Sequence, residues 1–277
     1  MKHLIPFYQA RLPIAIKDYR NGSYELEQLQ HLIQGVAARF KNELIKKGLD
    51  YDVFHNHFEK GTTSKQPRIL YQISNRTSLD SDRIKYATLT GFAEGASALK
   101  WLLHNFPNDV LWNGQREMFR PIDTIEKEAP LVEGGNVYRE YAVYEWLALS
   151  GNKGNKDMSN YEKYKSALDM GGRKELLQSI LIANLKNLFE RWGINTEDRP
   201  SCYITEITKV THDEVKYKQR DWYSFNLTFA CNWLLPDSIG IGNGIALGFG
   251  KIRLLETSVV ATEPRYERMQ RIAQLPK

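Results

Sequence analysis

A glycine-rich segment near the end of this 277-residue chain constrains its fold more than any other stretch. Residues 235–254 read LPDSIGIGNGIALGFGKIRL, and their glycines stand between two apolar runs that are typical of strands. The five glycines are Gly240, Gly242, Gly244, Gly248 and Gly250. Glycine adopts positive φ freely and lets the backbone lie close to a bulky ligand. The segment therefore predicts a loop between two strands, with its backbone accessible to a ligand.

Positive side chains accompany this loop. Lys251 and Arg253 follow the last glycine directly, and Asn243 lies among the glycines. Bare amide N–H groups beside two cations suit a chain of phosphates. We therefore expect the five glycines, Asn243, Lys251 and Arg253 to contact nucleic acid. A hairpin that only turns a corner is the alternative, although five glycines are more than a corner requires.

Two common nucleotide-binding loops do not fit the segment. A Walker A loop needs Gly-Lys-Ser or Gly-Lys-Thr after four intervening residues, and none of the five glycines is placed in that way. The dinucleotide fingerprint lacks its third glycine after Gly240 and Gly242. The sequence thus predicts no nucleotide cofactor.

Composition narrows the class of protein. The length allows two ordinary domains, the hydrophobic share of 42% supports a core, and the net charge of +5 is compatible with a polyanionic partner. Cys202 and Cys231 have neither CxxC spacing nor a nearby histidine pair, so we expect no disulfide framework, no metal and no cofactor. No window is long and apolar enough for a membrane span, and the N-terminus lacks the apolar run of a secretory signal. These features predict a cytoplasmic protein that does not contact a membrane.

The first half of the chain follows a recognisable order of elements. An extended start at 4–12 precedes an amphipathic helix that Ser23 caps and Gly48 ends. Extended runs at 68–73 and 86–89, a helix at 94–104 and a last strand at 118–122 come next. Strand, helix, strand, strand, helix and strand are the plan of a ferredoxin-like, or RRM-like, domain.

The second half repeats this plan without repeating the sequence. Charge, Pro130 and two glycines in 126–136 predict a boundary, which gives domains at 1–128, with the histidine pair described below, and 129–277, with the glycine loop. A strand at 138–149, a long amphipathic helix at 174–192 and a strictly alternating strand at 223–233 lead into the loop. The basic tail at 265–277 is read as a short helix or as disordered. The predicted fold class is α+β, with tandem ferredoxin-like domains.

Two histidines after the first helix are candidate catalytic groups. His55 and His57 flank one asparagine, and in an extended segment residues two apart share a face with Cα atoms roughly 6 to 7 Å apart. Cleaving RNA without a metal needs a base for the 2′-hydroxyl and an acid for the departing 5′-oxygen, and both roles suit imidazole near pH 7. Lys60, Lys65 and Arg68 would supply positive charge to the phosphate. Solvated or locally hydrogen-bonded histidines are the alternative interpretation.

The letters HNH do not indicate a metal-dependent nuclease here. The motif of that name is spread over a ββα unit, and further metal ligands are not apparent near His55. A metal-dependent DNA nuclease is therefore the most remote of the functions considered for this sequence.

Several segments together resemble one family. They are HNHFEKG at 55–61, QPRILYQI at 66–73, LTGFAEGASAL at 89–99, LLQSILIANLKNLFERWGI at 176–194 and IGIGNGIALGFGKI at 239–252. This set is similar to the CRISPR-associated Cas six endoribonucleases of the b subtype, within the RAMP superfamily. The resemblance implies metal-independent cleavage of CRISPR precursor RNA inside each repeat, with a 2′,3′-cyclic phosphate and a 5′-hydroxyl as products. It also implies that His55 and His57 are catalytic and that the loop at 240–250 shapes the RNA surface.

The chain departs from the family pattern at one place near the histidines. Gln66 stands before Pro67 where relatives often carry an aromatic residue, so Lys65 or Tyr71 is considered as a substitute for a phenolic group. The sequence leaves two main functions open: an endoribonuclease, or a scaffold subunit that holds a processed guide RNA without chemistry. Repeat RNA is the expected partner in both cases. An effector complex and a homodimer are also left open.

Overall fold

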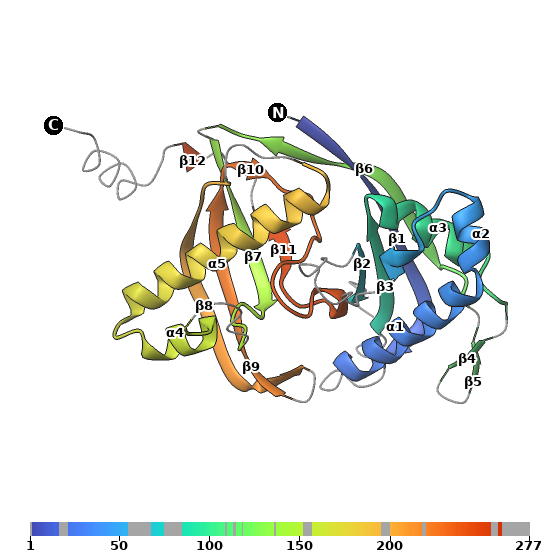
Figure 1. Ribbon diagram of the computed structural model, residues 1–277, viewed down its shortest axis with the longest axis horizontal. Coiled ribbons are helices and arrows are strands. Elements are labelled where there is room, and N and C mark those ends of the chain that lie inside the picture. The colour runs from blue at the N-terminus through green and yellow to red at the C-terminus, as the bar shows by residue number, and fades with distance from the viewer. Residues whose placement is uncertain are drawn as a thin grey trace, which may run out of the picture.

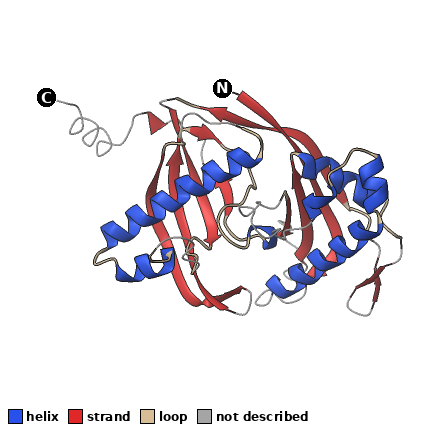
Figure 2. Cartoon of the chain, viewed as in Figure 1, coloured by secondary structure: helices blue, strands red, loops and turns tan. Residues whose placement is uncertain are grey.

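The computed structural model describes residues 2–16, 22–54, 68–74, 85–108, 110–112, 115–117, 119–135, 137–151, 157–194, 200–217, 220–255 and 260–261. Within these ranges the chain forms two units, each a sheet with helices on one face, and they lie side by side (Figures 1 and 2).

The N-terminal sheet has the strand order of a ferredoxin-like domain. Its strands lie in the order β10-β6-β1-β3-β2, and the pairs within it are antiparallel. Omitting β10, the order is fourth, first, third and second along the chain, as the βαββαβ plan requires. The elements are β1 (Lys2–Ile16), α1 (Gly22–Arg39), α2 (Lys41–Lys46), η1 (Tyr51–Phe54), β2 (Ile69–Ser74), β3 (Lys85–Phe92), α3 (Glu94–His104) and β6 (Asp123–Glu133). A small hairpin of β4 (Val110–Trp112) and β5 (Gln115–Glu117) follows α3.

The C-terminal sheet has the same strand order as a ferredoxin-like domain, but a loop stands in the place of the second helix. Its strands run β11-β7-β9-β8, with β12 (Val260–Ala261) also paired to β7. The elements are β7 (Val137–Trp146), α4 (Asn160–Ser166), α5 (Met170–Arg191), β8 (Cys202–Tyr217), β9 (Arg220–Cys231), β10 (Trp233–Leu234), η2 (Ile245–Leu247) and β11 (Lys251–Leu254). Where the plan has its second helix, this unit has the glycine loop, residues 235–250, with its short helix η2. The predicted tandem ferredoxin-like fold is confirmed.

The two units share a core. Side chains alternate along β1, so Ala10 and Leu12 pack under α1 and α3, whereas Ile5 and Phe7 belong to the cluster formed mainly by the second sheet and α5. Phe92 of β3 packs edge-on against Phe7 and stacks on Trp192 at the end of α5, with ring centroids 5.3 and 5.8 Å apart. The strand β10 also crosses from the second unit to pair with β6.

Two sequence predictions about the limits of elements need correction. The strand predicted at 118–122 lies at 123–133, because the charges and Pro130 of β6 resembled a linker. Pro130 is tolerated because β10 pairs with β6 only at Val132 and Glu133, so no ladder partner is needed on that side of Pro130. The helix predicted at 174–192 begins earlier, at Met170, where Asp169 caps it through a hydrogen bond from the Gly172 amide.

The first helix is interrupted. The chain forms α1 and α2 with a break at Phe40, and Gly48 follows α2 with a φ of +69°, as expected of a helix-ending glycine. The predicted domain division at residue 128 stays a prediction; β6 runs through it to Glu133. The basic tail at 265–277 lies outside the described residues.

Candidate functional site

The catalytic histidines predicted from sequence lie outside the described residues, as do Lys60 and Lys65. The structure does describe the chain immediately before and after this segment. Phe54, the residue before His55, is 1% exposed, and its carbonyl accepts a hydrogen bond of 2.8 Å from Gln34 Nε2 of α1. The chain is therefore firmly anchored where the histidine segment begins.

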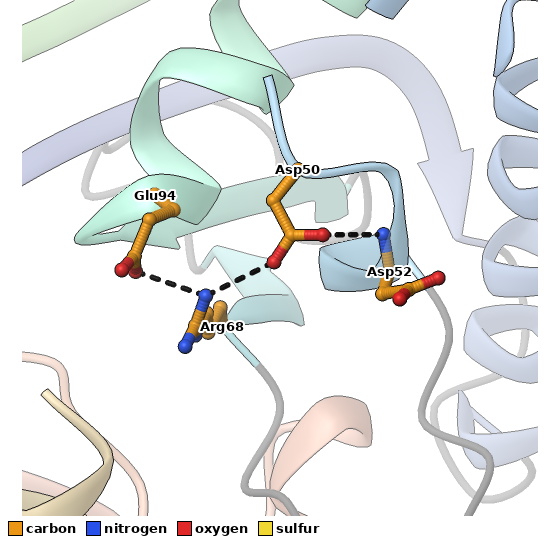
Figure 3. A network of polar contacts seen from close by, with 4 residues as sticks. All are labelled: Asp50, Asp52, Arg68 and Glu94. Carbon is orange, nitrogen blue, oxygen red and sulfur yellow. Dashed lines mark hydrogen bonds and ion pairs between the residues drawn. The ribbon is translucent and has the colours of Figure 1, made fainter. Parts of the chain in front are cut away.

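Arg68 anchors the chain where the segment ends. Its Nη1 lies 3.2 Å from Asp50 Oδ2 and 3.0 Å from Glu94 Oε2, so one guanidinium pairs with two carboxylates (Figure 3). The other oxygen of Asp50 accepts the backbone N–H of Asp52 at 2.9 Å and thereby caps η1. Arg68 thus joins the turn before the histidines to the N-terminus of α3.

This pairing changes the interpretation of Arg68. The sequence suggested a cation for the phosphate, but two acidic partners offset the charge of the guanidinium. The backbone carbonyl of Arg68 also accepts the N–H of Phe92 at 2.9 Å. We therefore regard Arg68 first as a residue that positions the end of the histidine segment.

Glycines in the GFAEG stretch make this arrangement possible. A Cβ on Gly95 would lie 2.5 Å from the carbonyl oxygen of Arg68, and one on Gly91 would lie 2.5 Å from the carbonyl oxygen of Gly95. Real Cβ atoms do not approach so closely, so α3 reaches the backbone of β2 and β3 only because both residues are glycine. The segment that marks the family resemblance therefore has a packing role.

The glycine loop is folded against itself. Several of its backbone N–H groups donate to carbonyls in or next to the loop, among them those of Ile241, Asn243, Leu247, Gly248, Phe249 and Gly250. The expectation of bare amides facing a phosphate is wrong for these six groups. Asn243 also uses its side chain locally, since its Nδ2 donates to the carbonyl of Leu147 at 2.9 Å.

Close packing explains why the loop needs glycine. Gly242, Gly244, Gly248 and Gly250 have φ between +67° and +88°, which other residues rarely adopt. A Cβ on Gly242 would lie 2.6 Å from the Trp146 ring, and one on Gly250 would overlap the Ile241 carbonyl. The loop is thus a compact structural unit, and close packing accounts for its glycines.

The loop meets the N-terminal unit at β2. A Cβ on Gly248 would lie only 3.3 Å from the carbonyl oxygen of Tyr71, so the backbones of the loop and of β2 are in contact (Figure 1). Arg68 directly precedes β2. Arg68 and the glycine loop, which are far apart in the sequence, therefore both adjoin this edge strand.

Tyr71 is not placed for catalysis. Its side chain is 1% exposed, and burial raises the pKa of its phenol far above the ordinary value. The suggestion that Tyr71 replaces a phenolic group of the family is therefore wrong, and Tyr71 is a core residue. Lys65, the other candidate, lies outside the described residues.

Cations after the loop share a face with an aromatic residue that the sequence analysis missed. In the ladder, Lys251 pairs with Tyr144 and Arg253 with Ala142, while Ile252 between them is fully buried on the other face. Tyr144 is 42% exposed. Burial lowers the pKa of Lys251, and the negative charge of Asp237 opposes this shift. The alternation VYREYAVYEW in β7 would have indicated Tyr144, but its partners depend on the register.

In the described part of the chain, no three His, Cys, Asp or Glu side chains are grouped so that they could hold a metal ion. Cys202 and Cys231 lie opposite each other in β8 and β9 as buried free thiols. None of the described helices is long and apolar enough to cross a membrane.

Comparison with known proteins finds a family match for the second unit. Residues 135–255 match the family model of the Cas6b C-terminal domain. The second unit is therefore similar to a Cas6b C-terminal domain. It contains the glycine loop, Tyr144, Lys251 and Arg253, whereas the histidine segment lies outside it. An uncharacterized protein of Methanocaldococcus jannaschii is 29% identical over 121 residues, which are 44% of this chain and 75% of that protein.

Solved structures extend the likeness to most of the chain. A crystal structure of Cas6b, 20% identical, covers 92% of this chain and all of its own, with a TM-score of 0.62. Another, titled a CRISPR RNA processing endoribonuclease Cas6b, is 19% identical with the same coverage and a TM-score of 0.58. The chain therefore has the Cas6b fold, and the resemblance drawn from the sequence is confirmed.

Proposed function

We propose that this chain is an endoribonuclease that cleaves CRISPR precursor RNA within its repeats. One observation carries the proposal: Arg68, which follows the histidine segment, directly precedes β2, and the glycine loop of the unit that matches the Cas6b C-terminal domain packs against the same strand. One solved structure of the same fold is titled a CRISPR RNA processing endoribonuclease, which supports the substrate class.

The proposed reaction needs no metal. His55 or His57 takes the proton of the 2′-hydroxyl, whose oxygen bonds to the phosphorus as the bond to the 5′-oxygen breaks. The other histidine gives a proton to that leaving oxygen. The products are a 2′,3′-cyclic phosphate and a 5′-hydroxyl. Lys60 and Lys65 stabilise the negative charge that develops on the phosphorane oxygens.

The described residues contribute position and RNA contact. Buried Phe54 and paired Arg68 fix the chain on both sides of the histidines, and rigid anchoring favours catalysis because small misplacements of reacting groups cost much rate. Tyr144, half-buried Lys251 and exposed Arg253 offer an aromatic ring and two cations on one face of the sheet, a combination that suits single-stranded RNA. Gly240 of the glycine loop forms a β-bridge with Lys251, so the loop adjoins this face.

The test is cleavage of a repeat RNA in EDTA by the wild type, His55→Ala and His57→Ala. Each substitution should slow cleavage by about 10² to 10⁴, and a 2′-deoxy nucleotide at the cut should block the wild type. Undiminished activity in both variants would remove the histidines from the mechanism. Tight repeat binding with no product over long incubation would favour the scaffold hypothesis. Membership of an effector complex, a homodimer and a cytoplasmic location stay predictions.

A further inference from the structure

A separate groove lies on the helix-covered side of the N-terminal sheet. Its volume is about 1110 Å³, and it runs between α3 and β6 with Tyr8 of β1 on its floor. Between 123 and 131, β6 has β1 on one side and is not paired with β10 on the other. None of the described residues that line the groove belongs to β2 or to the glycine loop.

One face of α3 forms a wall of this groove. Ser97, Lys100, Trp101 and His104 recur at helical spacing and therefore share a face. Trp101 is half-buried and packs edge-on against Phe40, with ring centroids 5.9 Å apart, while the other three side chains are exposed. The opposite face of α3 supplies the core. The wall thus presents an aromatic ring between polar and basic groups that the core does not require.

Positive charge prevails in the groove. Lys47 and Arg120 are exposed at its margins, and Arg120 Nη2 donates to the neutral Asn108 Oδ1 at 2.8 Å. Glu126 is the one carboxylate among the described lining residues. Lys100 Nζ donates to both of its oxygens at 2.8 and 2.7 Å, so its charge is already compensated. An anionic ligand therefore meets little repulsion.

We propose that this groove binds a single-stranded RNA segment that is not the segment cut. Lys47 and Arg120 would neutralise phosphates, and Trp101 would stack on a base. The volume lies about at the upper limit of the usual 300 to 1,000 Å³ of small-molecule sites, so the groove has room for a segment of polymer. An acidic polypeptide would use the cations but not the aromatic ring. Binding in this groove rests on the proposed function in one respect, which is that the ligand is RNA.

The experiment uses the full chain and a twelve-nucleotide oligouridine that contains 4-thiouridine and no repeat sequence. Photocrosslinking followed by peptide mapping finds the contacted segment, and fluorescence anisotropy at several salt concentrations gives Kd. The variants are the double substitution Lys47→Gln with Arg120→Gln, and Trp101→Leu. The matched control is Lys46→Gln with Lys163→Gln, which removes two exposed lysines outside the groove.

A crosslink in the peptide that contains Trp101 is expected in the wild type and in the control. The groove double variant should lower the salt slope of log K by about 1.4, because two phosphate contacts are lost. Trp101→Leu should weaken binding about tenfold. Because Trp101 also packs on Phe40, circular dichroism is used to check that the Trp101→Leu variant is folded. If that variant is unfolded, the test rests on the double variant Lys47→Gln with Arg120→Gln.

Two results would overturn the proposal. One is the absence of any crosslink in that peptide together with a Kd and salt slope of the double variant equal to the control. The other is displacement of the RNA by polyglutamate with no effect of Trp101→Leu, which would assign the groove to an acidic polypeptide. Cleavage of repeat RNA is measured with the same wild-type preparation, to separate the endoribonuclease function from RNA binding in the groove. If the wild type does not cleave the repeat, the proposed function is refuted, whereas the crosslink still tests binding in the groove.

Discussion

Arg68 is paired with two carboxylates, and removing one of them should have opposite effects on RNA binding and cleavage depending on the role of Arg68. If Arg68 positions the histidine segment, its carboxylate partners are needed and their removal is harmful. If Arg68 instead holds a phosphate, neutralising Asp50 or Glu94 releases its charge and tightens RNA binding. The substitutions Arg68→Gln and Glu94→Gln therefore distinguish the two roles.

The expected loss of stability follows from the geometry. Arg68 makes two ion pairs, its side chain is 27% exposed, and those of Asp50 and Glu94 are 43% and 55% exposed. Exposed pairs contribute roughly 0.2 to 1 kcal/mol each, so Arg68→Gln, which removes two pairs, should cost about 0.4 to 2 kcal/mol of unfolding free energy, and Glu94→Gln, which removes one, about half of that. Both costs should shrink in 1 M salt, which screens exposed charges.

Urea denaturation measures this loss, with Lys186→Gln as the matched control. Lys186 pairs with Glu190 one helical turn away at 3.4 Å, and breaking that pair should cost only about 0.3 to 0.5 kcal/mol. RNA binding is measured in parallel with a repeat RNA that carries a 2′-deoxy nucleotide at the cut. We expect Arg68→Gln to lower the rate of cleavage about ten- to hundredfold and to leave Kd within about twofold.

A different set of results would refute this reasoning. If Arg68→Gln leaves stability unchanged, weakens RNA binding and lowers the salt slope by about 0.7, the guanidinium contacts a phosphate. Tighter binding by Glu94→Gln would support the same conclusion. Arg68 would then be an RNA contact, as the sequence first suggested.

Three further substitutions test the packing described above. Gly95→Ala should destabilise the protein by more than about 1 kcal/mol in urea denaturation, because its Cβ would lie 2.5 Å from the Arg68 carbonyl. Gly35→Ala in α1, with open space around the new Cβ, should instead stabilise it by about 0.5 to 1 kcal/mol; equal effects would contradict the close approach of α3 to β2. Gly250→Ala should cost about 1 to 3 kcal/mol or more, because the residue has a φ of +67° and its Cβ meets a backbone carbonyl across the loop. Tyr71→Phe should leave the cleavage rate unchanged, since the phenol is buried and none of the described atoms pairs with it; a rate loss above tenfold would restore a catalytic role.

Periodicity in the sequence predicted most elements, because burial on one face imposes a repeat that can be read without the structure. The helix α3 has the predicted limits, and the alternating strand before the glycine loop is β9. The strand β6 was missed since its first six residues are all exposed, so they carry no apolar repeat. Edge strands of this kind resemble linkers in composition.

Long-range pairing explains what the sequence analysis missed in the site. Asp50 and Glu94 stand 18 residues before and 26 after Arg68, and nothing local marks them as its partners. The glycines lie in a loop between strands, as predicted, but their number reflects close packing. Their neighbours turn out to be Trp146, the Ile241 carbonyl and β2, which only the three-dimensional arrangement shows.

The shared core bears on how the site is held together. Ala129 and Leu131 of β6 are buried in the same cluster as the second sheet, and Trp192 of α5 stacks on Phe92 of β3. Phe92 in turn donates its N–H to the Arg68 carbonyl, so the residue that ends the histidine segment is linked through β3 to the helix of the other unit. The two sheets are separate in topology but continuous in packing. A shift of one sheet relative to the other would therefore move the glycine loop relative to Arg68. The geometry at β2 thus depends on both units.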